Sequence, residues 1–181
     1  MIVFIALLRA VNVGGTGKLA MSNLKSLCES AGFQAVCTFI ASGNVVFESE
    51  GSEAEVKAAL EAKLRAYAGK PVGVLVRTAA QMAEVLANNP FPEAAPNRTV
   101  AVFLDEAPTP DALEAVVGQQ AEELRLGARE IYVHYGDGMA RSKLRIPAAR
   151  AGTARNMNTV AKLASMAADA HARCGTEQSA R

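Results

Sequence analysis

The sequence has no tryptophan, few other aromatic residues and no paired cysteine motif. Six Phe and three Tyr make up its aromatic side chains, which leaves little for the base stacking used by proteins that bind single-stranded nucleic acids. The cysteines, Cys28, Cys37 and Cys174, are odd in number and never spaced as CxxC. We therefore expect no disulfide framework, no metal site and no cofactor. Cys28 falls at a core-facing helical position, and we interpret it as a small apolar residue.

Long apolar runs are also missing. No run approaches the roughly 20 apolar residues of a membrane-spanning helix. The apolar start of the chain, MIVFIALLRA, has no basic region before it and no small-residue cleavage pattern after it, unlike a secretory leader. We expect a cytoplasmic protein without membrane association.

What remains is the composition of a soluble globular protein. Half of the 181 residues are hydrophobic, a fifth are charged, and the formal net charge is +1. This length fits one large domain or two small ones.

The first part of the chain predicts the order β-α-β-β-α-β. The apolar run at 3–8 predicts a buried strand, and residues 21–31 repeat apolar side chains at helical spacing. The strands AVCTFI and NVVF flank the turn-like ASGN. Ser52 and Glu55 form a capping box for the next helix, and a strand at 72–76 completes the set. This order is the split βαβ, or ferredoxin-like, motif.

The second part predicts the order β-α-β-β-α after a helix at 79–88 capped by Thr78 and Gln81. Its elements are a strand at TVAVFL, a helix from Thr109 to Gly118, the strands ELRL and EIYVHY, and a final helix after Thr153. The final strand of the β-α-β-β-α-β motif is either absent from this part of the chain or supplied from elsewhere. The predicted fold class is α+β, with two tandem ferredoxin-like (split βαβ) units and antiparallel sheets. We place the units at 1–77 and 78–170, followed by a frayed tail at 171–181.

The glycine-rich loop after the first strand does not match a nucleotide-binding motif. In a Walker A comparison, Asn12 takes the first glycine position and Leu19 replaces the hydroxyl residue after Lys18. The segment GTGKLA does match G-x-G-x-x-[G/A], but no acidic residue ends the second strand and two strands follow in succession, against a Rossmann sheet. We interpret Gly14, Gly15 and Gly17 as a flexible connection.

Charge is distributed unevenly along the chain. Residues 100–124 contain six acidic residues and no basic one, whereas residues 138–168 contain six basic residues and no acidic one. Either the basic segment forms a positive surface or the two segments neutralise each other, and the two interpretations are compatible. With Thr153 as N-cap, Arg155, Asn156 and Asn158 begin the last helix, where backbone N–H groups favour an anion.

Several motifs together resemble the bacterial domain-of-unknown-function 1697 family. They are ALLRAVNVGG, GKLAMSNLKSLCESAGF, TFIASGNVVFES, NNPFP, GMARSKL and GTARNMNTVAKLASM, and the match runs from residue 2 to about 168. The resemblance implies tandem ferredoxin-like units and brings no established activity. Its polar motif positions are Arg9, Asn12, Lys18, Ser42, Gly43, Asn44, Ser142, Lys143, Arg155, Asn156, Asn158 and Thr159. Where the family carries Arg-Gly and Trp, this chain has Arg9-Ala10 and Met157.

Our first functional hypothesis is a binding module for a small phosphorylated or carboxylated ligand at the seam of the two units. The expected ligand-binding residues are Arg9, Asn12, Lys18, Ser42, Asn44, Ser142, Lys143, Arg155, Asn156 and Asn158. The alternative is an RNA- or DNA-binding protein in which Tyr132 and His134 form a small platform on one strand face. A third hypothesis is an enzyme of unknown reaction, with His134 near Asp137 as candidate base but no triad order or H-E-x-x-H motif. The oligomeric state stays open.

Overall fold

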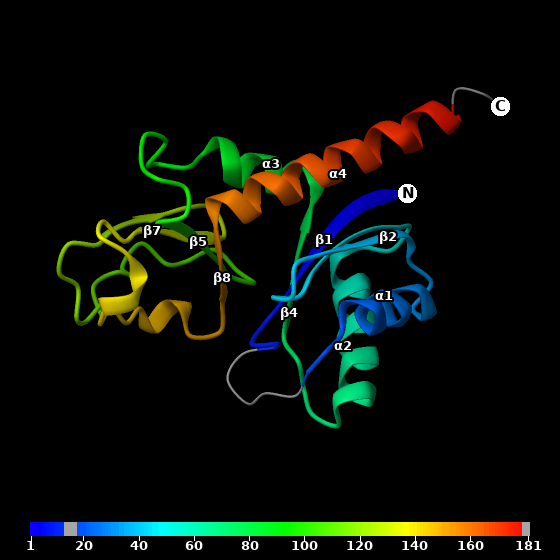
Figure 1. The fold of residues 1–181 in the computed structure, drawn as a ribbon, viewed down its shortest axis with the longest axis horizontal. Helices are drawn as coiled ribbons and strands as arrows, with labels where there is room; N and C mark the ends of the chain where they lie inside the picture. Colours follow the sequence, from blue (N-terminus) through cyan, green and yellow to red (C-terminus); the bar gives the residue numbers. More distant parts are fainter. Residues whose placement is uncertain (13–17, 179–181) are drawn as a thin grey trace. The chain divides into compact units, whose positions relative to one another are not determined.

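The computed structural model describes residues 1–12 and 18–178, with side chains described as far as Ala170. Within these residues the chain is an α+β protein with two four-stranded antiparallel sheets and four α-helices (Figure 1). Two compact units are present, Met1–Met82 with Leu163–Arg181 and Ala83–Lys162. Gly14, Gly15 and Gly17, interpreted above as a flexible connection, lie outside the described residues.

The first unit contains the sheet β2-β3-β1-β4, with the helices α1 and α2 on one face. Chain order is β1-α1-β2-β3-α2-β4, which confirms the predicted order of elements. The bounds are β1 Ile2–Leu8, α1 Met21–Ser30, β2 Gln34–Phe39, β3 Asn44–Ser49, α2 Glu53–Ala68 and β4 Val74–Thr78. Figure 1 shows α1 and α2 beside each other, and both pack on the sheet.

The core of the first unit follows the alternation of its strands. Phe4, Ala6 and Leu8 point toward the helices, whereas the intervening residues of β1 are buried on the opposite face. Cys28 is fully buried among these side chains, and burial raises the pKa of its thiol to about 12. Its interpretation as a small apolar core residue is confirmed. The capping box of Ser52 and Glu55 at the start of α2 is confirmed as well.

The second sheet has the order β6-β7-β5-β8. Its strands are β5 Thr99–Phe103, β6 Glu123–Leu126, β7 Glu130–His134 and β8 Thr153–Asn156. The helices α3 Ala79–Ala87 and α4 Met157–Gln178 each contain residues of both units. Thr78 and Gln81 exchange the two hydrogen bonds of the predicted cap at the start of α3.

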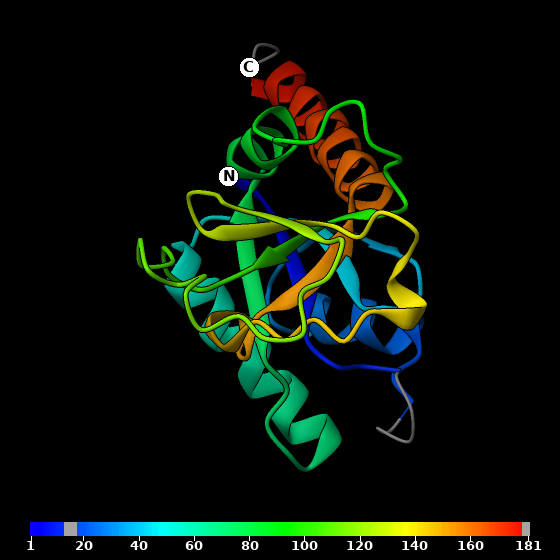
Figure 2. The ribbon, with the colours of Figure 1, turned by 90° about the vertical axis from the view of Figure 1, so that its left-hand side faces the viewer.

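The prediction of a helix from Thr109 to Gly118 is wrong. Backbone hydrogen bonds there span three residues, as from Ala112 N–H to the Thr109 carbonyl, and they form turns. Val117 instead exchanges two backbone hydrogen bonds with Arg145, at 3.1 and 2.9 Å. Because this pairing is distant in sequence, local helical spacing does not reveal it. Figure 2 shows the strands of the second unit with the green and yellow connections between them.

The start of the last helix also differs from its prediction. Thr153 begins strand β8 rather than capping the helix, so the strand predicted to be missing or borrowed is present. The helix is capped by Asn156, whose Oδ1 accepts a hydrogen bond of 3.0 Å from Thr159 N–H. At its other end α4 stays helical to Gln178, beyond residue 171, where we predicted a frayed tail. The compact units divide after Met82 and Lys162, whereas the prediction divided the chain after residue 77 and assigned all of the last helix to the second unit.

The turn between β2 and β3 requires its glycine. Gly43 has a φ of +80°, and an added Cβ would lie 2.5 Å from Val11 Cγ2 and 2.9 Å from Leu8 Cβ. Its carbonyl accepts a 2.8 Å hydrogen bond from Leu8 N–H. The predicted ASGN turn is therefore present and packs tightly against the end of β1.

We predict that Gly43→Ala destabilises the protein by about 2 to 4 kcal/mol, because it adds a steric clash to left-handed backbone strain. The matched control is Gly69→Ala. Gly69 has a φ of +68° but no heavy atom within 4 Å of an added Cβ, so strain alone costs about 1 kcal/mol there. Urea unfolding of both variants measures the difference; equal losses would contradict the packing role of the turn.

Candidate functional site

The connection that leaves β1 is closed by the side chain of Asn12. Its Oδ1 accepts a hydrogen bond from Leu19 N–H at 2.8 Å, and its Nδ2 donates to the carbonyl oxygens of Leu19 and Ala41 at 2.9 and 2.8 Å. One side chain thus ties the two ends of the loop to each other and to the β2–β3 turn. Asn12 has a φ of +55°, a left-handed conformation that Asn adopts more readily than most residues.

The other predicted residues of the first unit lie at the same end of the sheet. Arg9 N–H donates to the Gly73 carbonyl, and the Arg9 stem packs on that glycine. Asn44 Nδ2 donates to Ser42 Oγ and to the Phe39 carbonyl, inside the β2–β3 turn. These amide and hydroxyl groups hold loops together. Ala10, which stands where the family pattern has Gly, has a φ of +53°.

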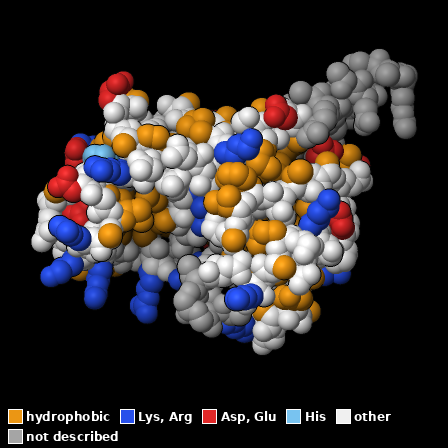
Figure 3. All heavy atoms as spheres, viewed as in Figure 1, with side chains coloured by type: hydrophobic (Ala, Val, Ile, Leu, Met, Phe, Trp, Pro, Cys, Tyr) orange, Lys and Arg blue, Asp and Glu red, His pale blue; other side chains and the backbone are white. Residues whose placement is uncertain are grey.

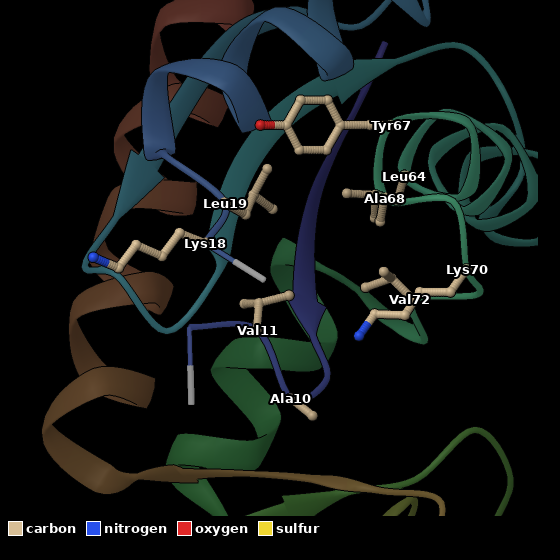
Figure 4. A pocket seen from close by; sticks show the side chains of 9 residues that line it. All are labelled: Ala10, Val11, Lys18, Leu19, Leu64, Tyr67, Ala68, Lys70 and Val72. Carbon is tan, nitrogen blue, oxygen red and sulfur yellow. The ribbon is translucent and has the colours of Figure 1, made fainter. Parts of the chain in front are cut away.

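A pocket of about 440 Å³ opens beside this loop closure (Figure 4). One side is formed by Ala10, Val11, Lys18 and Leu19 of the β1–α1 connection. The other side comes from the end of α2 and the segment that leads to β4, as Leu64, Tyr67, Ala68, Lys70 and Val72. Val11, Leu19 and Leu64 also belong to the buried core, so the pocket floor is apolar and is continuous with the interior of the unit.

The polar side chains among the described residues that line this pocket are those of Lys18, Lys70 and Tyr67. Among the described residues that line it, none is acidic, and Lys18, Tyr67 and Lys70 are exposed at its mouth. The Tyr67 hydroxyl accepts a 2.8 Å hydrogen bond from Asn23 Nδ2, which leaves its own proton to donate. The pocket therefore combines an apolar interior with donors and positive charge at its edge.

In the second unit, Ser142 and Lys143 lie in a segment that packs against the acidic one. Ser142 Oγ donates a short hydrogen bond to Glu122, whose carboxylate also accepts from Gln120 N–H at 2.6 Å. These hydrogen bonds, that from Ser142 foremost, hold the pKa of the buried Glu122 carboxyl below its usual range. Together with the Val117–Arg145 backbone pairing, they show that the acidic and basic segments pack together. Because these contacts join no basic side chain to an acidic one, neutralisation of the two segments stays a prediction.

Of the predicted site residues at the β8–α4 junction, Arg155 and Asn156 are engaged in the fold and Asn158 is exposed. Arg155 is only 8% exposed, and its Nη1 donates to Thr153 Oγ1 and to the Ala154 carbonyl, each at 2.9 Å. Burial lowers the pKa of this guanidinium to about 10. Asn156 is used as the helix cap, whereas Asn158 is exposed. Arg155 and Asn156 therefore have structural partners within the second unit.

The structure rules out the proposed Tyr132–His134 platform. Tyr132 is 2% exposed, and its hydroxyl donates to the Val85 carbonyl. His134 Nδ1 lies 3.3 Å from Thr99 Oγ1, and its ring centroid is 5.7 Å from that of Phe91. Its role as a catalytic base stays an untested prediction.

The part of the chain that the structure describes contains neither a membrane-spanning helix nor a metal-binding cluster. None of its helices is both long and apolar enough to cross a membrane. Within the same residues no three His, Cys, Asp or Glu side chains gather in a way that would hold a metal ion. The cytoplasmic location stays a prediction.

Sequence reasoning missed Tyr67 and Lys70, which line the pocket, and the fully buried Arg77 of β4, whose Nη1 donates to the Val76 carbonyl. Tyr67 and Lys70 carry no motif and are ordinary exposed residues at a helix end. Only the folded chain places them opposite Lys18. The burial of Arg77 could have been suspected only from its position in the apolar strand VLVRT.

The sequence profile of the domain-of-unknown-function 1697 family matches residues 1–132. No curated protein matches the chain. Among solved structures, the conserved bacterial protein SP0830 from Streptococcus pneumoniae is similar, with 24% identity and a TM-score of 0.76 over 92% of this chain and 98% of that one. This likeness concerns the fold. The chain belongs to the family, whose function is unknown.

We predict that Asn12→Ala lowers the free energy of unfolding by about 2 to 3 kcal/mol, because three hydrogen bonds, two of them partly buried, are lost. Asn12→Asp, which keeps the acceptor for Leu19 N–H, should lose less. As a control, Asn158→Ala changes an exposed asparagine and should stay within about 0.5 kcal/mol of wild type. Urea unfolding checks all three; an unaffected Asn12→Ala variant would show that the loop closure is dispensable.

Proposed function

We propose that this member of the family binds a small amphiphilic anion in the pocket of its first unit. Such a ligand has an apolar body and one carboxylate or phosphate group. The proposal keeps the ligand class that the sequence suggested and assigns it to the pocket between the β1–α1 connection and the end of α2. The observation that carries it is the combination of an apolar floor with two lysines and no acidic residue among the described lining residues.

The apolar floor favours a ligand with a hydrocarbon part. Val11, Leu19 and Leu64 are at most 8% exposed, so a ligand tail that enters the pocket meets side chains already packed into the core. Each methylene transferred from water contributes about 0.8 kcal/mol. At about 440 Å³ the pocket lies within the usual size range for small-molecule sites.

The lysines favour a negative head group. Lys18 and Lys70 belong to the two sides of the pocket, and the Tyr67 hydroxyl supplies a neutral donor. In Figure 4 the Lys18 ammonium points away from the other lining side chains, so its flexible side chain would turn toward the head group on binding. A hydrogen bond to a charged group contributes about 1.5 to 3 kcal/mol. The head group would therefore sit at the exposed mouth, while the tail points toward Leu64.

Asn12, Ser42 and Asn44 act as frame residues in this proposal rather than as ligand contacts. Their side chains already hydrogen-bond to the loop and turn that shape one wall of the pocket. Among the described residues that line the pocket, Lys18 is the one predicted site residue.

We also propose that both units are ferredoxin-like. The chain order β1-α1-β2-β3-α2-β4 and the sheet order β2-β3-β1-β4 support this for the first unit. The second sheet, β6-β7-β5-β8, repeats that strand order with turns in place of the first helix.

Thermal unfolding with three probes tests the ligand class. Hexyl phosphate carries both features, inorganic phosphate lacks the tail, and hexanol lacks the charge. Hexyl phosphate at about 100 times its dissociation constant should stabilise the protein by about 2.7 kcal/mol. At the same concentrations the other two probes should give much smaller shifts. Equal shifts with inorganic phosphate and hexyl phosphate would contradict the role of the apolar floor.

Charge-neutral variants test the position of the site. Lys18→Gln and Lys70→Gln should each weaken hexyl phosphate binding about ten- to hundredfold, because a charged hydrogen bond is lost. Lys25→Gln is the matched control, since Lys25 is an exposed lysine of the same unit that pairs with Glu29 instead. The proposal fails if the control weakens binding as much as the pocket variants.

A further inference from the structure

A short basic segment of the second unit has the features of a surface for a linear polyanion. Residues 142–146 run between the 3-10 turn Met139–Arg141 and a second one, Pro147–Ala149. Arg141, Lys143 and Arg145 are exposed, whereas Leu144 and Ile146 between them are half-buried against the core of the unit. We call Arg141, Lys143 and Arg145 the basic strip.

The strip is held in place by the rest of the unit. Arg145 exchanges two backbone hydrogen bonds with Val117, and Ser142 is bonded to the buried Glu122. The segment is thus held at two points, Ser142 and Arg145. In an extended chain alternate residues such as Lys143 and Arg145 are about 6.6 Å apart and point to the same side. Arg141, at the end of the preceding 3-10 turn, continues the alternation of exposed and half-buried residues. Three cations are therefore presented in a row from a fixed backbone, without the ordering cost of a flexible tail.

The charge around the strip has one sign along the chain. No acidic residue occurs between residues 138 and 168, and the nearby Glu122 is 7% exposed and occupied by hydrogen bonds. In Figure 3 several Lys and Arg side chains project at the lower left, where Figure 1 draws this segment in yellow, and Asp and Glu side chains lie above them. The surface is therefore suited to a partner with repeated negative charges.

We infer that the basic strip binds the phosphate backbone of single-stranded nucleic acid without reading its sequence. A row of exposed cations matches a chain of phosphates, whereas a single small anion is usually held by donors that converge on one point. No aromatic residue occurs between residues 138 and 152, so base stacking supplies nothing within the strip. Binding is electrostatic and steeply dependent on salt. This inference concerns the second unit and is independent of the pocket proposed above.

The test is fluorescence anisotropy of a labelled oligothymidylate of about 20 nucleotides with the full chain. Three phosphate contacts on a single strand give a slope of about −2 in log K against log salt, so affinity should fall about 20-fold between about 50 and 200 mM salt. The variant Arg141→Gln/Lys143→Gln/Arg145→Gln should lose this slope and most of the affinity. The charge-retaining variant Arg141→Lys/Lys143→Arg/Arg145→Lys should keep both.

A second triple variant separates the strip from net charge. Lys25→Gln/Lys63→Gln/Arg65→Gln removes the same three charges from helices α1 and α2 of the first unit and should leave both affinity and slope unchanged. Equal losses in the two neutral variants, or no binding by wild type at about 50 mM salt, would overturn the inference. So would tighter, strip-dependent binding to phosphatidylserine vesicles than to the oligonucleotide, which would identify an anionic membrane as the partner.

Discussion

The candidate site depends on three hydrogen bonds made by one side chain. Asn12 joins the two ends of the β1–α1 connection and fixes them to the β2–β3 turn. Without these hydrogen bonds, nothing would hold Val11 and Leu19 against the end of α2. Their apolar side chains would then no longer pack at the edge of the core. The polar residue is thus needed to build an apolar wall. Gly43 completes the arrangement, because its missing Cβ lets the turn approach Val11 closely.

The two sheets have the same strand order, but different elements cover their apolar faces. In the first, two amphipathic helices cover one face of the sheet, and the end of α2 leaves a pocket beside the loop closure. In the second, the corresponding apolar face is covered by Leu113, Val116, Leu144, Ile146 and Ala149, which come from connections without an α-helix. Extended connections alternate inward apolar and outward polar side chains. This alternation places the basic strip on the surface.

Most of the first unit is predictable from sequence because its signals are local. Ser52 and Glu55 mark a helix start within four residues, and alternation or helical spacing identifies each remaining element. The second unit is harder, because its pairings are distant in sequence. Pro110 and the apolar residues after it favour a helix locally, yet Val117 pairs with Arg145 across the unit. Thr153–Asn156 is a short strand whose buried side chains are a threonine and an arginine, so its pattern resembles a helix start.

The candidate site is only partly predictable for a related reason. The motif residues Arg9, Asn12, Ser42 and Asn44 do lie together, but most of their polar groups hold loops in place. Arg155 was expected at a ligand, yet its guanidinium is buried and bonded to Thr153. The pocket itself needs Tyr67 and Lys70, which become neighbours of Lys18 only through the fold. Motif positions therefore identify the residues that hold the loops around the pocket better than the residues that line it.

The most direct test is an amide chemical-shift titration of the full chain with hexyl phosphate. If the ligand occupies the pocket, the largest shifts will fall at residues 10–12, 18–19 and 64–72, and they will saturate with a single dissociation constant. Shifts centred on the basic strip or on β8, or no saturable shift in the first unit, would contradict the claim that the Asn12 loop closure builds a binding site.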